Sequence, residues 1–278
     1  YIYMAIRRGP LAPPESATEV FDVDLTTSTS AFSVGFPVDL WLGKETTRAN
    51  GTFVSDRLRG GTKYLLTPST AAEATDSGGI AVFDLQDSFK QGAASQELVN
   101  WMWKRAPGFC DVVAYTGNGT ARTINHNLGV EPEMMWVKGR NYVENWGVYH
   151  KDVGATKYLM LNQTSAEATY TAAWNNTAPT SSVFTLGGWN AVNESGYNYV
   201  AYVFAHNNSD GGFGPDGDQD VIKCGSYTGT GAAGNFIDLG FEPQWVFYKR
   251  TDSTGNWVMQ DNMRGMSHSG YDLLYANS

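Results

Sequence analysis

The chain has 278 residues, of which 13% are aromatic and 17% are charged, and its formal net charge is −9. This acidic balance repels polyanions and argues against nucleic acid as a partner, while the aromatic content excludes a disordered chain. No apolar run is long enough to span a bilayer. Abundant glycine, tyrosine and tryptophan suit short strands joined by tight turns, and the length allows two to three domains.

Several sequence motifs recur along the chain, and this repetition predicts an array of similar domains. Residues 60–66 match residues 154–160 at a shift of 94, and Trp146 recurs 111 residues later as Trp257. Both chain ends cut across a repeat, so we expect a fragment of a longer polypeptide. The predicted segments are a closing strand of a preceding repeat (1–8), a Pro-rich linker (9–18), β repeat 1 (19–107), β repeat 2 (108–206), a Gly/Asp-rich linker (207–219) and a partial β repeat 3 (220–278).

Strand signals dominate within each repeat. Short apolar runs at 134–137 and 245–248, each preceded by a proline, predict central strands buried on both faces. They align Trp136 with Trp245. The predicted fold class is all-β, with tandem antiparallel β-sandwich units that each bury their own two-layer core.

Single helical turns are expected once in each of two repeats. Thr70 and Glu73, like Thr164 and Glu167, have the spacing of a capping box, in which a hydroxyl and a carboxylate three residues later cap the first turn of a helix. The prediction is therefore an all-β fold with short single-turn helices.

Three acidic residues in the second linker are the candidate metal ligands. Asp216, Asp218 and Asp220 occupy alternate positions, like the first ligands of a calcium loop. The sixth position is Val221 and the twelfth is Tyr227, where a calcium loop has Gly and Glu. This departure favours a solvated acidic turn over a Ca²⁺ site, and no other cofactor is expected.

Tryptophans are the candidate ligand-binding residues. Trp174 and Trp189 are unrepeated and lie in Asn- and Gly-rich surroundings typical of surface loops. Aromatic rings with Asn and Asp nearby suit sugar rings, which have an apolar face and a polar rim. Trp146 and Trp257 are repeated, which favours a place in the core.

Residues with catalytic potential form no recognisable constellation. Cys110 and Cys224 lack metal-ligand spacing and are expected to be buried free thiols. There is no nucleophile elbow and no P-loop. We therefore expect no enzyme. The histidines do not recur between the aligned copies and are expected to be ordinary surface or turn residues: His126, His150, His206 and His268.

Residues 109–119, 126–138, 154–159 and 241–246 resemble an uncharacterised repeat domain that occurs in tandem in tail or fibre proteins of tailed bacteriophages, many of them marine. Residues 1–10 are similar to a junction in such proteins. The resemblance has no established catalytic residues to carry over. It implies a structural, oligomeric virion protein, extracellular when mature, with host-surface glycan binding.

Two other hypotheses stay open beside a spacer and adhesive region of a tail or fibre. One is a polysaccharide-degrading tail enzyme, and the other is a subunit of a bacterial extracellular filament or adhesin. The expected partners are other copies of the chain, other virion proteins and host-surface polysaccharide. Repetition would make such binding multivalent.

Overall fold

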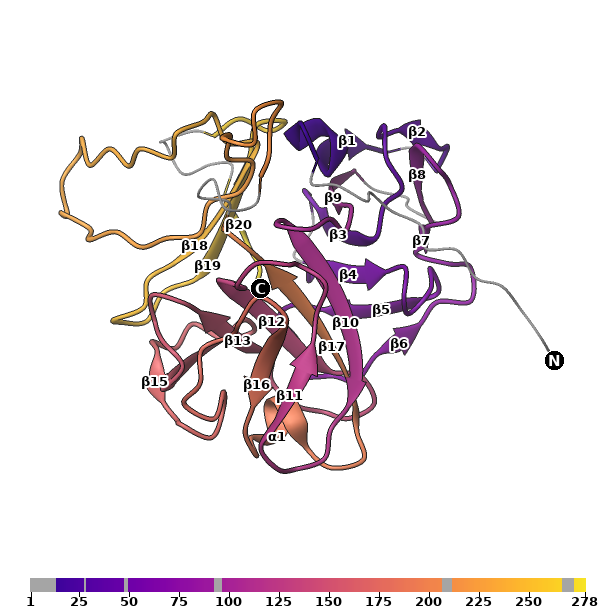
Figure 1. The fold of residues 1–278 in the computed structure, drawn as a ribbon. Coiled ribbons are helices and arrows are strands. Elements are labelled where there is room, and N and C mark those ends of the chain that lie inside the picture. The colour runs from indigo at the N-terminus through magenta and orange to yellow at the C-terminus, as the bar shows by residue number, and fades with distance from the viewer. Residues whose placement is uncertain (1–13, 28, 48–49, 93–96, 207–211, 267–272) are drawn as a thin grey trace.

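The computed structural model describes residues 14–27, 29–47, 50–92, 97–206, 212–266 and 273–278. Regular structure in these ranges is nearly all antiparallel β, which confirms the predicted all-β class (Figure 1). The predicted closing strand at 1–8 lies outside the described residues. So do residues 9–13 and 207–211 of the two predicted linkers.

The strands of the described ranges form three main sheets and two small ones. The first sheet has the order β1 (Phe21–Thr26), β9 (Leu98–Trp103), β3 (Leu40–Glu45), β4 (Phe53–Asp56), β5 (Lys63–Leu66), β6 (Ala74–Thr75). The second sheet has the order β10 (Cys110–Thr116), β17 (Asn198–Phe204), β12 (Met134–Gly139), β13 (Gly147–His150), β14 (Lys157–Met160), β15 (Ala168–Thr169). The third sheet has the order β18 (Trp245–Lys249), β19 (Trp257–Asp261), β20 (Leu274–Tyr275). The small sheets are β2 (Phe32–Ser33), β8 (Ser88–Gln91), β7 (Ala81–Val82) and β11 (Arg122–Asn125), β16 (Val183–Leu186).

One interior, the central core, is shared by all three main sheets. Leu42 and Trp101 reach it from the first sheet, Trp136 and Tyr202 from the second, and Trp257 from the third, each at most 2% exposed. Figure 1 shows the sheets grouped around this centre, the first at upper right, the second below and the third at upper left. Burial of each such side chain stabilises the fold by about 1.5–3 kcal/mol. The expectation that each repeat buries a self-contained core is therefore wrong.

Two outer cores cover the opposite faces of the first and second sheets. Trp41 and Phe89 lie in the first outer core, between the first sheet and the small sheet β2-β8-β7. Met135 and Phe184 lie in the second outer core, beneath β11-β16. Both sheets are thus covered on two faces. This agrees with the prediction that residues 134–137 form a central strand, since β12 is buried from its second residue onward.

The sheets are joined by contacts that recur around the central core. Lys138 donates from Nζ to the carbonyl oxygen of Thr70 in the first sheet's chain (3.2 Å), and Lys249 donates to that of Thr164 in the second (3.0 Å). Lys44 of the first sheet makes the third such contact, because its Nζ donates to the carbonyl oxygen of Ser278, which follows the last strand of the third sheet (2.7 Å). Each lysine thus ties its own sheet to a neighbouring one.

The expected helical turns at 70–73 and 164–167 do not form. The backbone at Thr70 instead accepts the amide of Glu144, and the amide of Glu73 donates to Arg140 (2.7 Å). The local capping pattern loses to these contacts with the next sheet. In the part of the chain that the structure describes, two short helical segments lie elsewhere, a 3-10 turn at Ala17–Glu19 and α1 at Asn190–Asn193.

The alignment of Trp136 with Trp245 is wrong by two residues. Trp136 lies opposite Val148, and the residue opposite Met259, which is the counterpart of Val148, is Phe247. Matching tryptophan to tryptophan misled the alignment, because the shift of 111 residues that relates Pro132 to Pro243 sets Trp136 against Phe247. The prediction that Trp146 and Trp257 are core residues is confirmed, with exposures of 0% and 2%.

Candidate functional site

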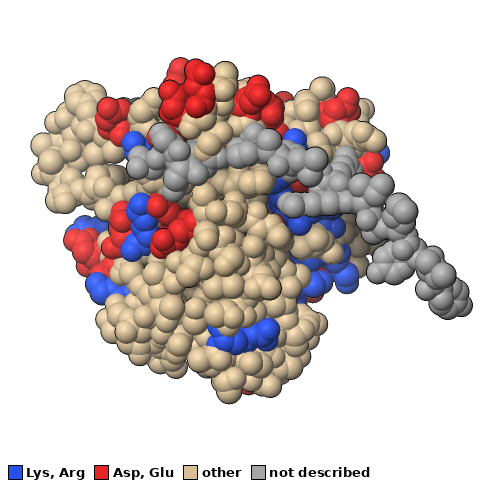
Figure 2. Space-filling view, in the orientation of Figure 1, with Lys and Arg blue, Asp and Glu red and all other residues tan. Residues whose placement is uncertain are grey.

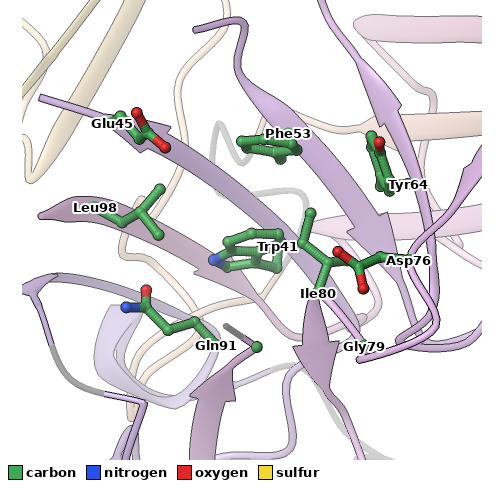
Figure 3. Close-up of a pocket in the computed structure, with 10 residues that line it drawn as sticks. Trp41, Glu45, Phe53, Tyr64, Asp76, Gly79, Ile80, Gln91 and Leu98 are labelled. Carbon is green, nitrogen blue, oxygen red and sulfur yellow. The ribbon is translucent and has the colours of Figure 1, made fainter. Parts of the chain in front are cut away.

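A cleft of about 250 Å³ opens on the outer side of the first sheet. Figure 3 shows side chains from the main sheet and from the covering segments converging on it. Its volume is below the roughly 300–1,000 Å³ of pockets that hold drug-sized ligands, so it suits a smaller group. The cleft is lined by Trp41, Glu45, Phe53, Tyr64, Asp76, Gly79, Ile80, Gln91, Gly92 and Leu98.

One wall of the cleft is aromatic. Trp41, Phe53 and Tyr64 lie on three adjacent strands, β3, β4 and β5, and their side chains point to the same face of the sheet because strand residues alternate. The rings of Phe53 and Tyr64 meet edge to face at 5.5 Å. The buried indole of Trp41 donates to Oδ1 of Asn100 at 2.8 Å, which fixes its orientation. These contacts hold the rings of the wall against the sheet without a ligand.

The floor beneath Trp41 depends on a glycine. A Cβ atom at Gly43 would lie 2.0 Å from Cζ2 of the Trp41 ring, so the indole can fold over the strand only because this position has no side chain. In the second sheet the equivalent residue is Val137, which lies in the second outer core. This difference distinguishes the two sheets at the site.

Polar groups stand at the cleft's rim. Glu45 accepts a hydrogen bond at Oε2 from Asn50 (2.9 Å), and Asp76 accepts one at Oδ1 from the amide of Gly78 (2.8 Å). Each carboxylate keeps a second oxygen, and the side chain of Gln91 also lines the cleft. An aromatic wall beside carboxylate and amide groups can bind a small polyhydroxylated ring.

The corresponding place on the second sheet is filled. Tyr158, the counterpart of Tyr64, packs against Trp189 at 4.4 Å between ring centroids. Tyr170 stands where the first sheet has Asp76 and also contacts Trp189, at 6.2 Å. The Trp189 ring further covers Gly147, at the position of Phe53. On the second sheet, three aromatic side chains therefore fill the space that corresponds to the cleft of the first sheet: Tyr158, Tyr170 and Trp189.

Both tryptophans predicted to bind a ligand are buried in the second outer core. Trp174 is 1% exposed and donates from Nε1 to the carbonyl oxygen of Lys157 (3.0 Å), and Trp189 is 9% exposed. The expectation that they lie on exposed loops is wrong, because the small sheet and α1 fold over the loops that carry them. Their role in ligand binding stays a prediction.

The three linker aspartates do not converge. Within the described ranges no three His, Cys, Asp or Glu side chains lie close enough to hold a metal ion, and these ranges include Asp216, Asp218 and Asp220. Asp216 and Asp218 are exposed and Asp220 is half-buried, in a turn where Phe213 pairs with Gln219. This geometry gives no support to the calcium site.

Both cysteines are free in the structure. Burial raises the pKa of Cys110 well above its ordinary value, and burial together with the charge of Glu133 raises the pKa of Cys224 to about 12. Both thiols therefore stay protonated near neutral pH and are poor nucleophiles. Cys224 is partly exposed, where full burial was expected.

Sequence reasoning missed the cleft residues. Tyr64 lies in the repeated stretch 60–66, and repetition alone points to a core role. The available signal was a difference between copies, because Asp76 in one copy is aligned with Tyr170 in the other. A residue that changes from aromatic to acidic at an aligned position marks a place where the copies diverge in surface chemistry.

A family profile described as a domain of unknown function, DUF7483, matches residues 16–278. The chain belongs to the DUF7483 family. No curated protein and no solved structure matches the chain significantly. Across the described part of this DUF7483 chain, no helix is both long and apolar enough to cross a membrane. Because the family description states no function, we infer a function of this DUF7483 domain from the open cleft and its filled counterpart on the second sheet.

Proposed function

We propose that the chain is a structural and adhesive region of a bacteriophage tail or fibre protein, in which the cleft on the first sheet binds a sugar residue of a host-surface glycan. The region consists of tandem two-layer β units that share the central core. The observation that carries the binding role is the open aromatic-lined cleft at a place that the second sheet fills with Trp189.

The chemistry of the cleft supports a sugar ring. A pyranose presents an apolar C–H face, which stacks on an aromatic ring such as Tyr64, and hydroxyl groups, which donate to carboxylates such as Glu45 and Asp76. Figure 2 shows acidic side chains gathered along the upper edge of one face, while basic side chains lie at its lower centre and sides. Together with the net charge of −9, this favours neutral or basic sugars over acidic ones.

The expected affinity for one sugar is weak. A small ligand with about twelve heavy atoms that gains about 0.3 kcal/mol per atom binds with a Kd roughly in the millimolar range. Strong attachment would then come from several copies acting together, as expected for a multivalent fibre.

Binding is tested by NMR titration of the full chain with a panel of neutral, amino and acidic monosaccharides. Tyr64→Ala should abolish the shifts caused by the preferred sugar. Tyr227→Ala removes a tyrosine that is 57% exposed and far from the cleft in sequence, and it should leave them unchanged. Equal loss in both variants, or no shifts with any sugar, contradicts the proposal.

A second candidate function uses the same cleft. Glu45 and Asp76 are two carboxylates that line one aromatic pocket, the residue types that a glycoside hydrolase requires. An assay for new reducing ends with host exopolysaccharide separates the two functions. Turnover that Glu45→Gln abolishes would establish the enzyme, whereas binding without turnover favours adhesion.

A further inference from the structure

The first two main sheets share one feature that the third sheet, as far as the structure describes it, does not have. In each, the last strand lies between the first strand and a central strand, giving the orders β1-β9-β3 and β10-β17-β12. This last strand, here called the closing strand, pairs on both sides along its whole length in β9 and along all but Asn198 in β17. It therefore supplies the partner that each opening strand needs.

The third sheet has an open edge, meaning the edge of β18 that faces away from β19. β18 is the end strand of its sheet among the described residues, and all of its five residues are only half-buried. The corresponding positions of β12 are almost all buried. Residues 245–248 were expected to form a central strand, and the exposure of β18 reflects the lack of a described neighbour.

The opening strand of the third sheet is also missing from the described structure. The sequence of residues 220–227 resembles that of β10, yet these residues form no strand and run through the orange loop at the left of Figure 1. An opening strand has nothing to pair with when the closing strand is not in place, so one missing element explains both observations. The site thus requires a single extended segment between β18 and residues 220–227.

The geometry points to residues 1–7 of the same chain as this segment. Residues 1–7 lie outside the described ranges and are identified by sequence alone. The run Ile6-Arg7-Arg8-Gly9-Pro10 matches Trp103-Lys104-Arg105-Ala106-Pro107, which ends β9 and leads to the next sheet. We propose that this segment adds to the open edge as an antiparallel closing strand and completes the third sheet.

The register follows from the other two sheets. Leu40 lies opposite Trp103 and Met134 opposite Phe204, and these pairs place Trp245 opposite Ile6. Side chains at alternate positions, Ile2, Met4 and Ile6, then face the central core. Apolar residues at all three inward positions are what that core requires.

The connection to the first sheet is short enough. The ring of Phe21, which begins β1, lies 6.4 Å from the ring of Trp245, where the closing strand would end. The fourteen intervening residues, 7–20, could span about 45–50 Å if extended. The chain can therefore pass from the third sheet to the first, as it passes from β9 to β10.

The occupancy of the open edge is tested by disulfide trapping in the full chain, with Cys110→Ala and Cys224→Ser removing the native thiols. The proposed register sets Ala5 opposite Val246, so an Ala5→Cys, Val246→Cys variant should form an intrachain disulfide under mild oxidation. Its control is Met4→Cys with Val246→Cys, which places the two thiols on opposite faces of the sheet. Linked peptides from monomeric protein in the first variant alone support the proposal.

Two outcomes of the trapping overturn it. A disulfide found only in dimers assigns the edge to a second copy, and no disulfide in either variant shows that residues 1–7 do not occupy it. Hydrogen exchange gives a second measurement that needs no engineered thiols. Met4→Asp should raise the exchange rates of the β18 amides at least tenfold, whereas Tyr3→Asp, facing outward, should change them less than twofold; equal effects also overturn the proposal.

Discussion

Trp257 donates a hydrogen bond from its indole Nε1 to the carbonyl oxygen of Met160, at 2.8 Å, across the boundary between the third and second sheets. Trp146 makes the same bond to Leu66, at 3.1 Å, between the second and first sheets. Each backbone amide of these tryptophans is held by an asparagine, Asn277 or Asn162. The repeated tryptophans therefore join sheets as well as filling the core.

Trp146→Phe tests this joining role. Phenylalanine keeps an aromatic ring in the core but removes the indole donor, so the carbonyl of Leu66 keeps the bond from the amide of Ser69 and loses the one between the sheets. The lost hydrogen bond should lower the free energy of unfolding by about 0.5–1.5 kcal/mol. The loss should appear as a lower urea midpoint followed by circular dichroism. Trp257→Phe should lose a similar amount, and a negligible change in both would contradict the assignment.

Arg59 is the centre of a buried polar network between the first two sheets. Its guanidinium contacts Asp56 (2.5 Å) and Glu73 (3.3 Å) and donates to the hydroxyl of Tyr202 (2.8 Å). Burial alone would lower the pKa of Arg59, but Tyr202 and the two carboxylates raise it above the ordinary value. Arg59 therefore stays charged.

Arg59→Met should destabilise the fold by about 3–5 kcal/mol, because it leaves the buried carboxylate of Asp56 without its cation. Urea unfolding measures the loss. Arg250→Met is the matched control, since Arg250 pairs with Asp252 on the surface and such exposed pairs contribute little. A loss below 1 kcal/mol for Arg59→Met would show that the network is dispensable.

His126 predicts a pH dependence of stability. Nε2 lies 2.9 Å from the carbonyl oxygen of Thr180 and Nδ1 accepts the amide of Leu128, so the folded state favours the neutral ring. Burial lowers the pKa of His126 below 6.5, opposed by the Thr180 bond and by Asp111. The unfolded chain then binds more protons, and the stability present above pH 6.5 falls as the pH drops from there toward the folded-state pKa.

His126→Gln should flatten this profile. Unfolding free energies of both proteins at pH 7.5 and pH 5 provide the measurement, and the difference between the two pH values should be smaller in the variant. If the wild-type and variant slopes coincide, His126 does not titrate across this range.

Gly43→Ala should displace the Trp41 ring from the aromatic wall of the cleft. The added methyl group would overlap the Trp41 ring and force it to move, at a cost of about 1–3 kcal/mol. The NMR shifts with sugar should disappear along with this loss of stability. Gly225→Ala, where a Cβ atom meets nothing within 4 Å, is the control and should preserve both. Unchanged binding in Gly43→Ala would separate the cleft from glycan recognition.

Sequence reasoning predicted the elements better than their assembly. Repetition identified Trp146 and Trp257 as core residues, and apolar runs identified β12 as a buried strand. Periodicity reports which residues are buried, but it does not say which other sheet they pack against. The shared central core was for this reason not predictable. Nor was the hydrogen bond from Lys138 to the carbonyl oxygen of Thr70, which forms where a helical turn was expected.

The candidate site was less predictable than the fold. Trp174 and Trp189 sit in polar, Gly-rich segments that look exposed, yet a small sheet and a short helix cover them. Their burial depends on contacts between residues far apart in sequence, which composition does not encode. The cleft itself arises because, among the residues that the structure describes, none on the first sheet takes the place of Trp189, and only comparison of the two folded sheets shows this.

A common interior also determines how the region responds to tension. A chain of separate domains extends under load one domain at a time. Here the side chains of three sheets occupy one volume, and Lys44, Lys138 and Lys249 tie neighbouring sheets together. Pulling one sheet away exposes the apolar faces of the other two, so the whole region should resist force as one element and rupture in one step.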